Sequence, residues 1–541
     1  MTAAATPAER GRGIRARWPY LLAGPFLLLA PLTTFVAHAG YPFYAPELLL
    51  CLLGVGGTGL AFGAIIAVSP TWLRTLLAAG MVLFVIDVQS GWFATLGLRR
   101  ASLIVFAVAA VLWLMRDELG QRLLVVVSGV LFLTSFLVPA SSIWRVQGGA
   151  TNGSADRAPF VQIILDEHIG IEGIPEEFDP GGVFATRIRE TLEQRGFTVF
   201  TRAYSRYNNT GRAIPAALNF AAPAEVNPFV EDANREPAQM LANATISQLH
   251  ERGYQVHAVQ TKFLDLCHVS GQSVVEECAT YTLNTIASIR DLPVGAWTKT
   301  GMILGMFLQR SELHERLRRV LGWPEPRRVS AVSTMRAWDP IVSMLRRARP
   351  GDAYLIHLML PHFPYTFDSE CRMRPDPNSW LDSSAPAAAP RQNTLDSRRV
   401  RYPLYLEQLD CTQQLVSRLL DALVEAGVYD QSIVLIHGDH GSRIATVPPV
   451  SPFLDELRPQ DYVDSFSTLF VAKLPGVPGG TDRRVLPLED LTAAVVRDER
   501  LPQGAAPEAP WVWVLDVGSE RLERRPLPSF AHGRVERAPS E

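Results

Sequence analysis

Apolar residues concentrate in five runs within the first 140 residues, and a more polar pattern replaces them afterwards. Most of these runs approach the ~20 residues that an α-helix needs to cross a bilayer. A cleaved signal peptide is the alternative for the first run, but no small-residue cleavage site follows it and four more runs do. We therefore expect five transmembrane helices, at residues 18–39, 46–68, 75–93, 101–115 and 123–140.

Beyond residue 157 the pattern alternates between short apolar runs and amphipathic stretches. The stretches ATRIRETLEQRG and ATISQLHERG combine helical spacing with a glycine stop, and an apolar run follows each of them. Strands that alternate with helices predict an α/β domain with a mostly parallel sheet flanked by helices. In such sheets, functional groups gather beyond the carboxyl ends of the strands.

The pattern also predicts where the parts of the chain begin and end. Residues 302–323 are amphipathic and basic, and we expect them to form an ordinary helix that covers the sheet, with a helix on the membrane surface as the alternative. We expect a transmembrane domain at residues 1–140, a Gly-rich linker at 141–157, an α/β domain at 158–500, and an edge strand (WVWVLDV) with a Pro-rich tail at 501–541.

Composition and charge agree with a membrane protein. Charged residues make up 19% of the 541 residues, below the roughly 25% of soluble proteins. The net charge of −3 and the absence of a long basic run argue against a nucleic-acid partner. Arginines are dense before the first apolar run, which places the N-terminus inside. In a bacterium, five crossings would make this a multi-pass protein of the inner (cytoplasmic) membrane, with residues beyond 141 in the periplasm or outside the cell.

Four of the five cysteines follow the apolar region, as expected of an oxidising compartment. Three pairings are possible, with free buried thiols as the alternative. We favour Cys267–Cys278 with Cys371–Cys411, because the first pair closes a short local loop. No two cysteines stand at Cys-x-x-Cys spacing, which argues against a thiolate zinc site.

Three predicted strands end in acidic or histidine side chains. Each group alone is weak evidence for a functional site, since acids often cap helices and a lone histidine is usually structural. Three such ends in one parallel sheet would converge in space. Carboxylates and imidazoles suit Zn²⁺ or Mn²⁺, and the oxygen-rich part also suits Mg²⁺ or Ca²⁺. The residues are Asp166 and Glu167 after FVQIIL, His357 and His362 in YLIHLMLPHFPY, and His437, Asp439 and His440 in SIVLIHGDHG.

The order of these motifs resembles the alkaline phosphatase and sulfatase superfamily. A strand ending in an acid, then HFP, then a late DHG after another strand carry the resemblance. Five membrane helices before the α/β domain make the chain most similar to a membrane-anchored branch, which includes lipoteichoic acid synthases and lipid A phosphoethanolamine transferases. That resemblance implies an extracytoplasmic, metal-dependent enzyme.

The resemblance also implies roles for individual residues. The stretch YNNTGRAIP matches a family pattern of Thr followed five residues later by Pro, which makes Thr210 the expected nucleophile; the alternative is a helix N-cap. We expect one or two divalent metal ions, bound by Asp166, Thr210, Asp439 and His440, with Glu167 as a further ligand. We expect His362, Arg443 and Arg212 to bind the substrate, with His362 also catalytic, and His357, His168 and His437 to be structural.

The implied reaction moves a phosphoethanolamine or phosphoglycerol head group from a membrane phospholipid to an envelope glycan or lipid, through a phospho-threonine. The alternatives are a sulfatase-like hydrolase of phosphoric or sulfuric esters and a non-catalytic envelope protein. Threonine cannot give the formylglycine of true sulfatases, so sulfate-ester hydrolysis by the usual route is disfavoured. The intact residue set argues against the non-catalytic alternative, and we expect a monomer.

Overall fold

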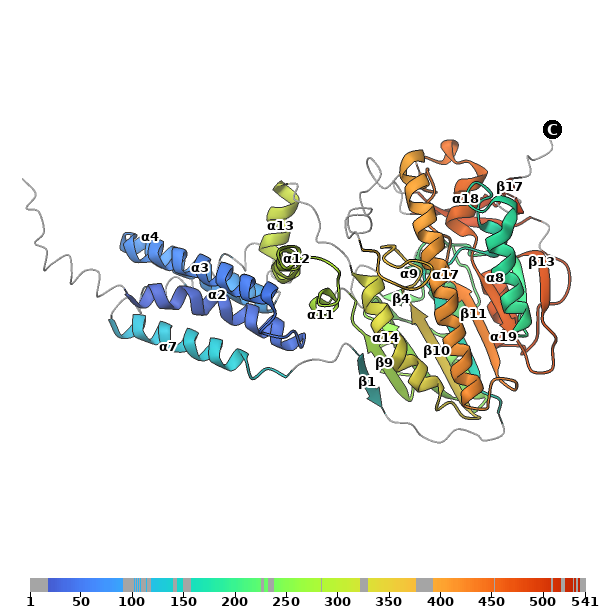
Figure 1. Ribbon diagram of the computed structural model, residues 1–541, viewed down its shortest axis with the longest axis horizontal. Helices are drawn as coiled ribbons and strands as arrows, with labels where there is room; N and C mark the ends of the chain where they lie inside the picture. Colours follow the sequence, from blue (N-terminus) through green and yellow to red (C-terminus); the bar gives the residue numbers. More distant parts are fainter. Residues whose placement is uncertain are drawn as a thin grey trace, which may run out of the picture. The chain divides into compact units, whose positions relative to one another are not determined.

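A computed structural model divides the chain into two compact units, which are described separately below (Figure 1). One unit comprises Met1–Ser142 with Thr285–Arg327, and the other comprises Ile143–Asn284 with Arg328–Glu541. The residues that the structure describes are 18–90, 102, 104, 106, 108, 113, 118–139, 144–148, 157–224, 228–231, 238–283, 285–321, 329–375, 393–451, 453–506, 509–516, 521–528, 530–531 and 534–535.

Three helices of the first unit are long and apolar enough to cross a membrane: α2 (Trp18–His38), α3 (Pro46–Val68) and α4 (Thr71–Ser90). The prediction of five such helices was therefore too high for the described residues. The fifth run forms α7 (Glu118–Ser135), whose apolar stretch Leu119–Ser135 is shorter than those of the other three helices. The fourth run, 101–115, lies mostly outside the described residues, as do the arginines that precede α2. By their length and composition, these three helices suggest a membrane anchor.

Helices α2 and α3 pack closely because glycines face the contact. A Cβ atom on Gly24 would lie 2.2 Å from the carbonyl oxygen of Gly59, and one on Gly63 would lie 2.3 Å from that of Tyr20. Small residues spaced four apart, as Gly59 and Gly63 are, let helix backbones approach in a membrane, where dispersion contacts replace the hydrophobic effect. A hydroxyl pair, Thr33 with Ser135, joins α2 to α7 at 2.5 Å.

The first unit also contains a segment that returns from much later in the sequence. Residues 285–321 form α11 (Ile286–Ile289), α12 (Ala296–Leu308) and α13 (Glu312–Leu321). This segment includes the amphipathic stretch that was expected to cover the sheet. That expectation was wrong, because Thr300 and Ser311 bond to α3 and α4 instead.

The second unit is built on a nine-stranded mixed sheet. Strand β2 lies between β10 and β11 and runs parallel to both. Two strands oppose the common direction, β1 at one edge and β12 in the interior. In spatial order the strands are β1 (Trp144–Gly148), β9 (Glu277–Tyr281), β6 (Gln255–Thr261), β10 (Asp352–Leu358), β2 (Phe160–Leu165), β11 (Ile433–Gly438), β12 (Phe470–Lys473), β3 (Thr198–Tyr204) and β13 (Gly480–Pro487).

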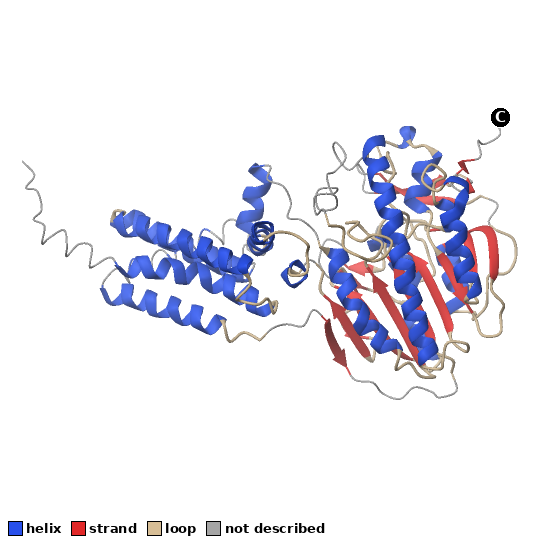
Figure 2. Ribbon diagram, viewed as in Figure 1, coloured by secondary structure: helices blue, strands red, loops and turns tan. Residues whose placement is uncertain are grey.

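Helices cover both faces of this sheet, as the alternating pattern predicted (Figure 2). One face carries α9 (Thr210–Leu218), α10 (Ala244–Glu251) and α19 (Leu488–Val496), whose apolar side chains share a core with the strands. The opposite face carries α8 (Val183–Gln194), α14 (Ser330–Leu345) and α17 (Leu395–Glu425). Strand β2 is buried along its whole length, because helices lie on both its faces.

Smaller elements complete the second unit. The run WVWVLDV forms the expected strand, β14 (Trp511–Asp516), which pairs with β15 (Arg521–Pro526) in a separate two-stranded sheet. Within the expected linker, residues 144–148 form strand β1. The other elements are α18 (Pro459–Phe466), a four-stranded sheet of β4 (Val230–Glu231), β5 (Ala238–Met240), β7 (Leu264–Val269) and β8 (Gln272–Ser273), and the pair β16 (Phe530–Ala531) and β17 (Arg534–Val535).

Both expected disulfides are present in the structure. Cys267–Cys278 links β7 to β9, and Cys371–Cys411 links the loop after β10 to α17. The fifth cysteine, Cys51, is free and buried. The second bridge therefore ties the loop that carries His362 to the longest helix of the unit.

Candidate active site

Three parallel strands bring the candidate residues to one edge of the sheet. Leu165 at the end of β2 pairs in register with Leu358 of β10 and with Gly438 of β11. Residues that follow these strands therefore meet, since parallel strands end at the same edge. Asp166 follows β2 directly, and Asp439 follows β11.

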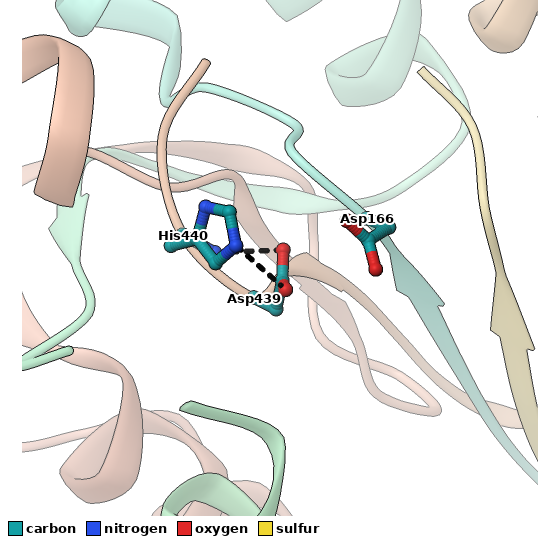
Figure 3. A group of neighbouring side chains, drawn as sticks. All are labelled: Asp166, Asp439 and His440. Carbon is teal, nitrogen blue, oxygen red and sulfur yellow. Dashed lines mark hydrogen bonds and ion pairs between the residues drawn. The ribbon is translucent and has the colours of Figure 1, made fainter. Parts of the chain in front are cut away.

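Asp166, Asp439 and His440 form a buried cluster at this edge (Figure 3). One ligand-type atom from each lies within 4.8 Å of the others. His440 Nε2 is 3.2 Å from Asp439 Oδ2. The backbone N–H groups of Glu167 and His440 donate to Asp439 Oδ1 at 2.9 and 2.8 Å, which fixes the orientation of this carboxylate. Carboxylate oxygens beside an imidazole nitrogen are a donor set for a divalent transition metal.

Thr210 presents its hydroxyl to this cluster from the first position of α9. Its Oγ1 lies 3.3 Å from Asp166 Oδ2 and 3.3 Å from His440 Nε2. The N-cap position belongs to Asn209, whose Oδ1 accepts from the Arg212 backbone N–H at 3.1 Å. The alternative role of Thr210 as the helix cap is thus taken by its neighbour.

Glu167 has a left-handed backbone, with φ at 61°, which is uncommon for a residue with a Cβ atom. Two hydrogen bonds hold it there. Its N–H donates to Asp439, and its carbonyl oxygen accepts from the Tyr405 hydroxyl at 2.7 Å. Its carboxylate then lies 3.5 Å from His362 Nε2 and 3.7 Å from Arg443 Nη1.

Two histidines five residues apart both reach the site. His357, in β10, places Nε2 3.3 Å from Asp166 Oδ2, although a structural role was expected for it. Its other ring nitrogen is buried without a hydrogen-bond partner in the described structure. His362 lies on the loop after β10, within 4.8 Å of Asp166 and Glu167 as a second group of possible ligands. The sequence signal for His357 is its place one residue before the end of β10, at the functional edge.

The two candidate arginines occupy different places. Arg443 follows the DHG motif and lies beside Glu167, with 44% of its side chain exposed. A substrate oxygen could thus reach it from solvent. Arg212 lines a small hollow on the first turn of α9, together with Tyr207, Pro223 and Phe229. Its Nε is buried and has no hydrogen-bond partner among the described residues.

The electrostatics of the cluster are those of crowded, buried carboxylates. Burial raises the pKa of Asp166, but His362 and His357 outweigh it, and the pKa falls to about 2. Burial and the charge of Asp166 raise the pKa of Asp439. Burial lowers the pKa of His362, yet Glu167 and Asp166 raise it above the usual value, which favours its protonated form. Negative charge is thus concentrated where a cation would be stabilised.

A divalent cation fits this arrangement. Asp166 Oδ1 is buried and has no hydrogen bond within the described structure, and Asp439 Oδ2 has only its 3.2 Å contact with His440 Nε2. Leaving buried anionic oxygens unpaired costs several kcal/mol, unless a cation compensates them. We infer that Asp166, Asp439, His440 and Thr210 would hold one ion. The group around Glu167 and His362 offers a place for a second.

A comparison with known protein families identifies the family of this chain. Residues 184–463, more than half of the 541, match the sulfatase family. The chain belongs to the sulfatase family. The matched span contains Thr210, His362, Asp439 and His440, and it begins after Asp166. The protein is therefore a sulfatase-like enzyme, and this family is metal-dependent.

Solved structures that resemble this sulfatase-family chain share little sequence with it. At 14% identity each, they include a 4S-sulf protein of glycosaminoglycan metabolism from Bacteroides thetaiotaomicron (69% of this chain and 84% of that one, TM-score 0.41), the C-terminal periplasmic domain of EcEptC from Escherichia coli (68% and 91%, 0.38) and the phosphonate monoester hydrolase SpPMH from Silicibacter pomeroyi (66% and 80%, 0.39). No curated protein sequence matches the chain. Because these TM-scores are low, the assignment rests on the family match.

Two histidines beside the sulfatase site are buried and fully paired. His168 Nε2 accepts from Gln413 at 2.6 Å, and His437 Nε2 accepts from Gln162 at 2.8 Å. The Nδ1 atom of each donates to a neighbouring backbone carbonyl. Burial lowers the pKa of both to about 4. These contacts agree with the structural roles expected for them.

Because burial keeps His168 and His437 neutral, we expect the metal-free protein to lose stability as the pH falls from about 6.5 towards 4. In this window the unfolded histidines bind protons and the folded ones do not, so acidification favours unfolding, by up to about 3 kcal/mol for each residue. The double variant His168→Gln/His437→Gln should show a flatter dependence of melting temperature on pH, whatever its stability at pH 7.5. Thermal melts in chelator exclude an effect of metal loss, and equal slopes would contradict the prediction.

Several supporting residues of the sulfatase site carried no sequence signal. Tyr405 holds the Glu167 carbonyl from α17. The buried Asp464 accepts hydrogen bonds from Tyr402 and Arg398, while its backbone carbonyl accepts from the Arg443 N–H. These contacts fix the loop after β11. They join positions far apart in the chain, and no local pattern reveals them.

Proposed function

We propose that this enzyme transfers a phospho-head group, of the phosphoethanolamine or phosphoglycerol type, from a membrane phospholipid to an envelope glycan or lipid. The observation that carries the proposal is the position of the Thr210 hydroxyl. It lies between Asp166 and His440, beside buried carboxylate oxygens that have no hydrogen bond. A hydroxyl in this position suits nucleophilic attack on an ester of phosphoric acid.

The proposed chemistry has two balanced steps. Thr210 Oγ1 loses its proton and attacks the donor phosphorus, the bond from phosphorus to the diacylglycerol oxygen breaks, and that oxygen takes up a proton, so the step releases no net proton. An acceptor hydroxyl then attacks the phospho-threonine, the Thr210–phosphorus bond breaks, and the threonine hydroxyl is restored. A bound divalent cation would favour the ionised threonine oxygen and offset the negative charge on the phosphoryl group. His362, whose pKa is raised, suits donation of the proton to the leaving oxygen.

The apolar helices of the first unit favour a membrane lipid as the donor substrate. Three described helices are long and apolar enough to cross a membrane, and such an anchor would give the enzyme access to lipid donors. A hydrolase of soluble esters would need only one membrane-spanning helix to stay at the membrane. The two disulfides suit an oxidising compartment, so we place the catalytic unit in the periplasm or outside a bacterial cell.

A hydrolase is the second candidate. The consecutive acids Asp166 and Glu167 favour it, because hydrolytic sulfatases resemble this chain in having two acids at that position. Both carboxylates lie in the site together with His362. In this alternative, water replaces the acceptor in the second step.

The test uses the full-length protein in detergent with fluorescent phospholipids of ethanolamine, glycerol or choline head group. We expect diacylglycerol from one preferred donor and a head-group phosphate on Thr210 in intact-protein mass spectra. An added glycan acceptor should accelerate diacylglycerol release if the enzyme is a transferase. A rate that is independent of acceptor would favour the hydrolase. Turnover of an aryl sulfate with no phospholipid cleaved would overturn the proposal.

A further inference from the structure

The inserted segment 285–321 carries a feature that the catalytic chemistry does not use. It leaves the sulfatase sequence after β9 and rejoins it before α14, yet it packs on the apolar helices. The Thr300 hydroxyl donates to the Glu47 carbonyl at 3.0 Å, and the Ser311 hydroxyl donates to Asp87 Oδ2 at 2.7 Å. Arg310 donates to the Val88 carbonyl at 3.2 Å.

These contacts all fall at one end of the apolar helices. Glu47 lies in the first turn of α3, whereas Asp87 and Val88 lie in the last turn of α4. Consecutive membrane helices alternate in direction, so the start of α3 and the end of α4 are on the same side of the bilayer. Phe35, near the end of α2, also packs on Phe307 of α12. The segment therefore sits where the apolar helices reach water.

Helix α13 leaves an apolar stripe uncovered at this level. Leu317, Val320 and Leu321 lie on one side of the helix, since their spacing follows the helical period. Their exposed fractions are 48%, 82% and 51%. Arg316 and Arg318 flank the stripe, as in helices that lie in a membrane interface. On the preceding helix α12, Trp297 is 76% exposed, and tryptophan is enriched at membrane interfaces.

We propose that α12 and α13 lie in the head-group region of the bilayer, with Leu317, Val320, Leu321 and Trp297 in contact with lipid. The stripe would contact the phospholipid surface, because the segment packs on the ends of helices that would themselves cross the bilayer.

The test is fluorescence quenching on full-length protein in phosphatidylcholine vesicles. A Val320→Cys variant carries an environment-sensitive nitrobenzoxadiazole label, and Asp396→Cys on α17, whose side chain is 94% exposed, is the matched control. Wild-type protein treated with the same label measures the background signal, which should be low because its free cysteine, Cys51, is buried. We expect lipids with a doxyl group on the acyl chain to quench the Val320 label roughly twofold or more beyond the control, and iodide to quench it less.

Two results would overturn the proposal. Iodide quenching of the Val320 label equal to that of the control, without doxyl quenching, would place α13 in water. Protection from both quenchers would mean that protein, from this chain or a second copy, covers the stripe. The measurement does not depend on turnover, so it is independent of the proposed reaction.

Discussion

Replacing Thr210 by alanine is expected to lower head-group release by at least about 10³-fold without unfolding the catalytic unit, because the attacking oxygen is lost. The side chain is almost fully buried, and its hydroxyl contacts Asp166 and His440. The helix keeps its cap, since Asn209 provides it. Diacylglycerol release from the preferred fluorescent phospholipid measures the activity, and a thermal melt measures the fold.

Two variants separate a nucleophile from a structural residue at this position. Thr210→Ser keeps the hydroxyl and should retain measurable turnover and the covalent intermediate. Asn209→Ala should do the opposite of Thr210→Ala: it removes the helix cap, which costs about 1 kcal/mol, but it leaves the attacking oxygen in place. If Thr210→Ala turns over at a rate close to that of the wild type, the hydroxyl is not the nucleophile.

The location of the site could be predicted from the sequence because it depends on strand ends. The apolar runs that become β2 and β11 are short and bounded by polar residues, and parallel pairing then brings Asp166 and Asp439 together. Thr210 needed the family resemblance, since a threonine before a helix usually serves as a cap. The place of His357 beside Asp166 depends on its position along β10, which the sequence gives only within a residue or two.

The remaining features depend on contacts between distant parts of the chain. The amphipathic pattern of 302–323 fits a helix on any apolar surface, so it could not distinguish the sheet from the membrane helices. The left-handed backbone of Glu167 results from bonds to Asp439 and Tyr405, far away in sequence. Strand β12 runs antiparallel to both of its neighbours inside the sheet, and nothing in its short apolar run reveals that direction.

The second large effect is expected at Asp439, where substitution by asparagine should release the metal and stop turnover. Asparagine has the same shape, and its Oδ1 can still accept from the backbone N–H groups of Glu167 and His440. The variant therefore loses a charge and an anionic ligand while the loop keeps its bonds. We expect metal affinity to fall by about 10²-fold or more. Elemental analysis of dialysed full-length protein measures this loss, and His437→Gln, two residues earlier in strand β11, should keep its metal.

Metal should raise the stability of the wild type much more than that of Asp439→Asn. In chelator, burial and the charge of Asp166 raise the pKa of Asp439, so removing this carboxylate's charge should leave the melting temperature equal or higher. With metal at about 100 times its dissociation constant, the wild type gains about 2.7 kcal/mol and the variant gains little. The two stabilities should therefore cross as metal is added. A variant that is equally destabilised with and without metal would make Asp439 a structural residue, whereas one that gains as much as the wild type would remove it from the ligand set.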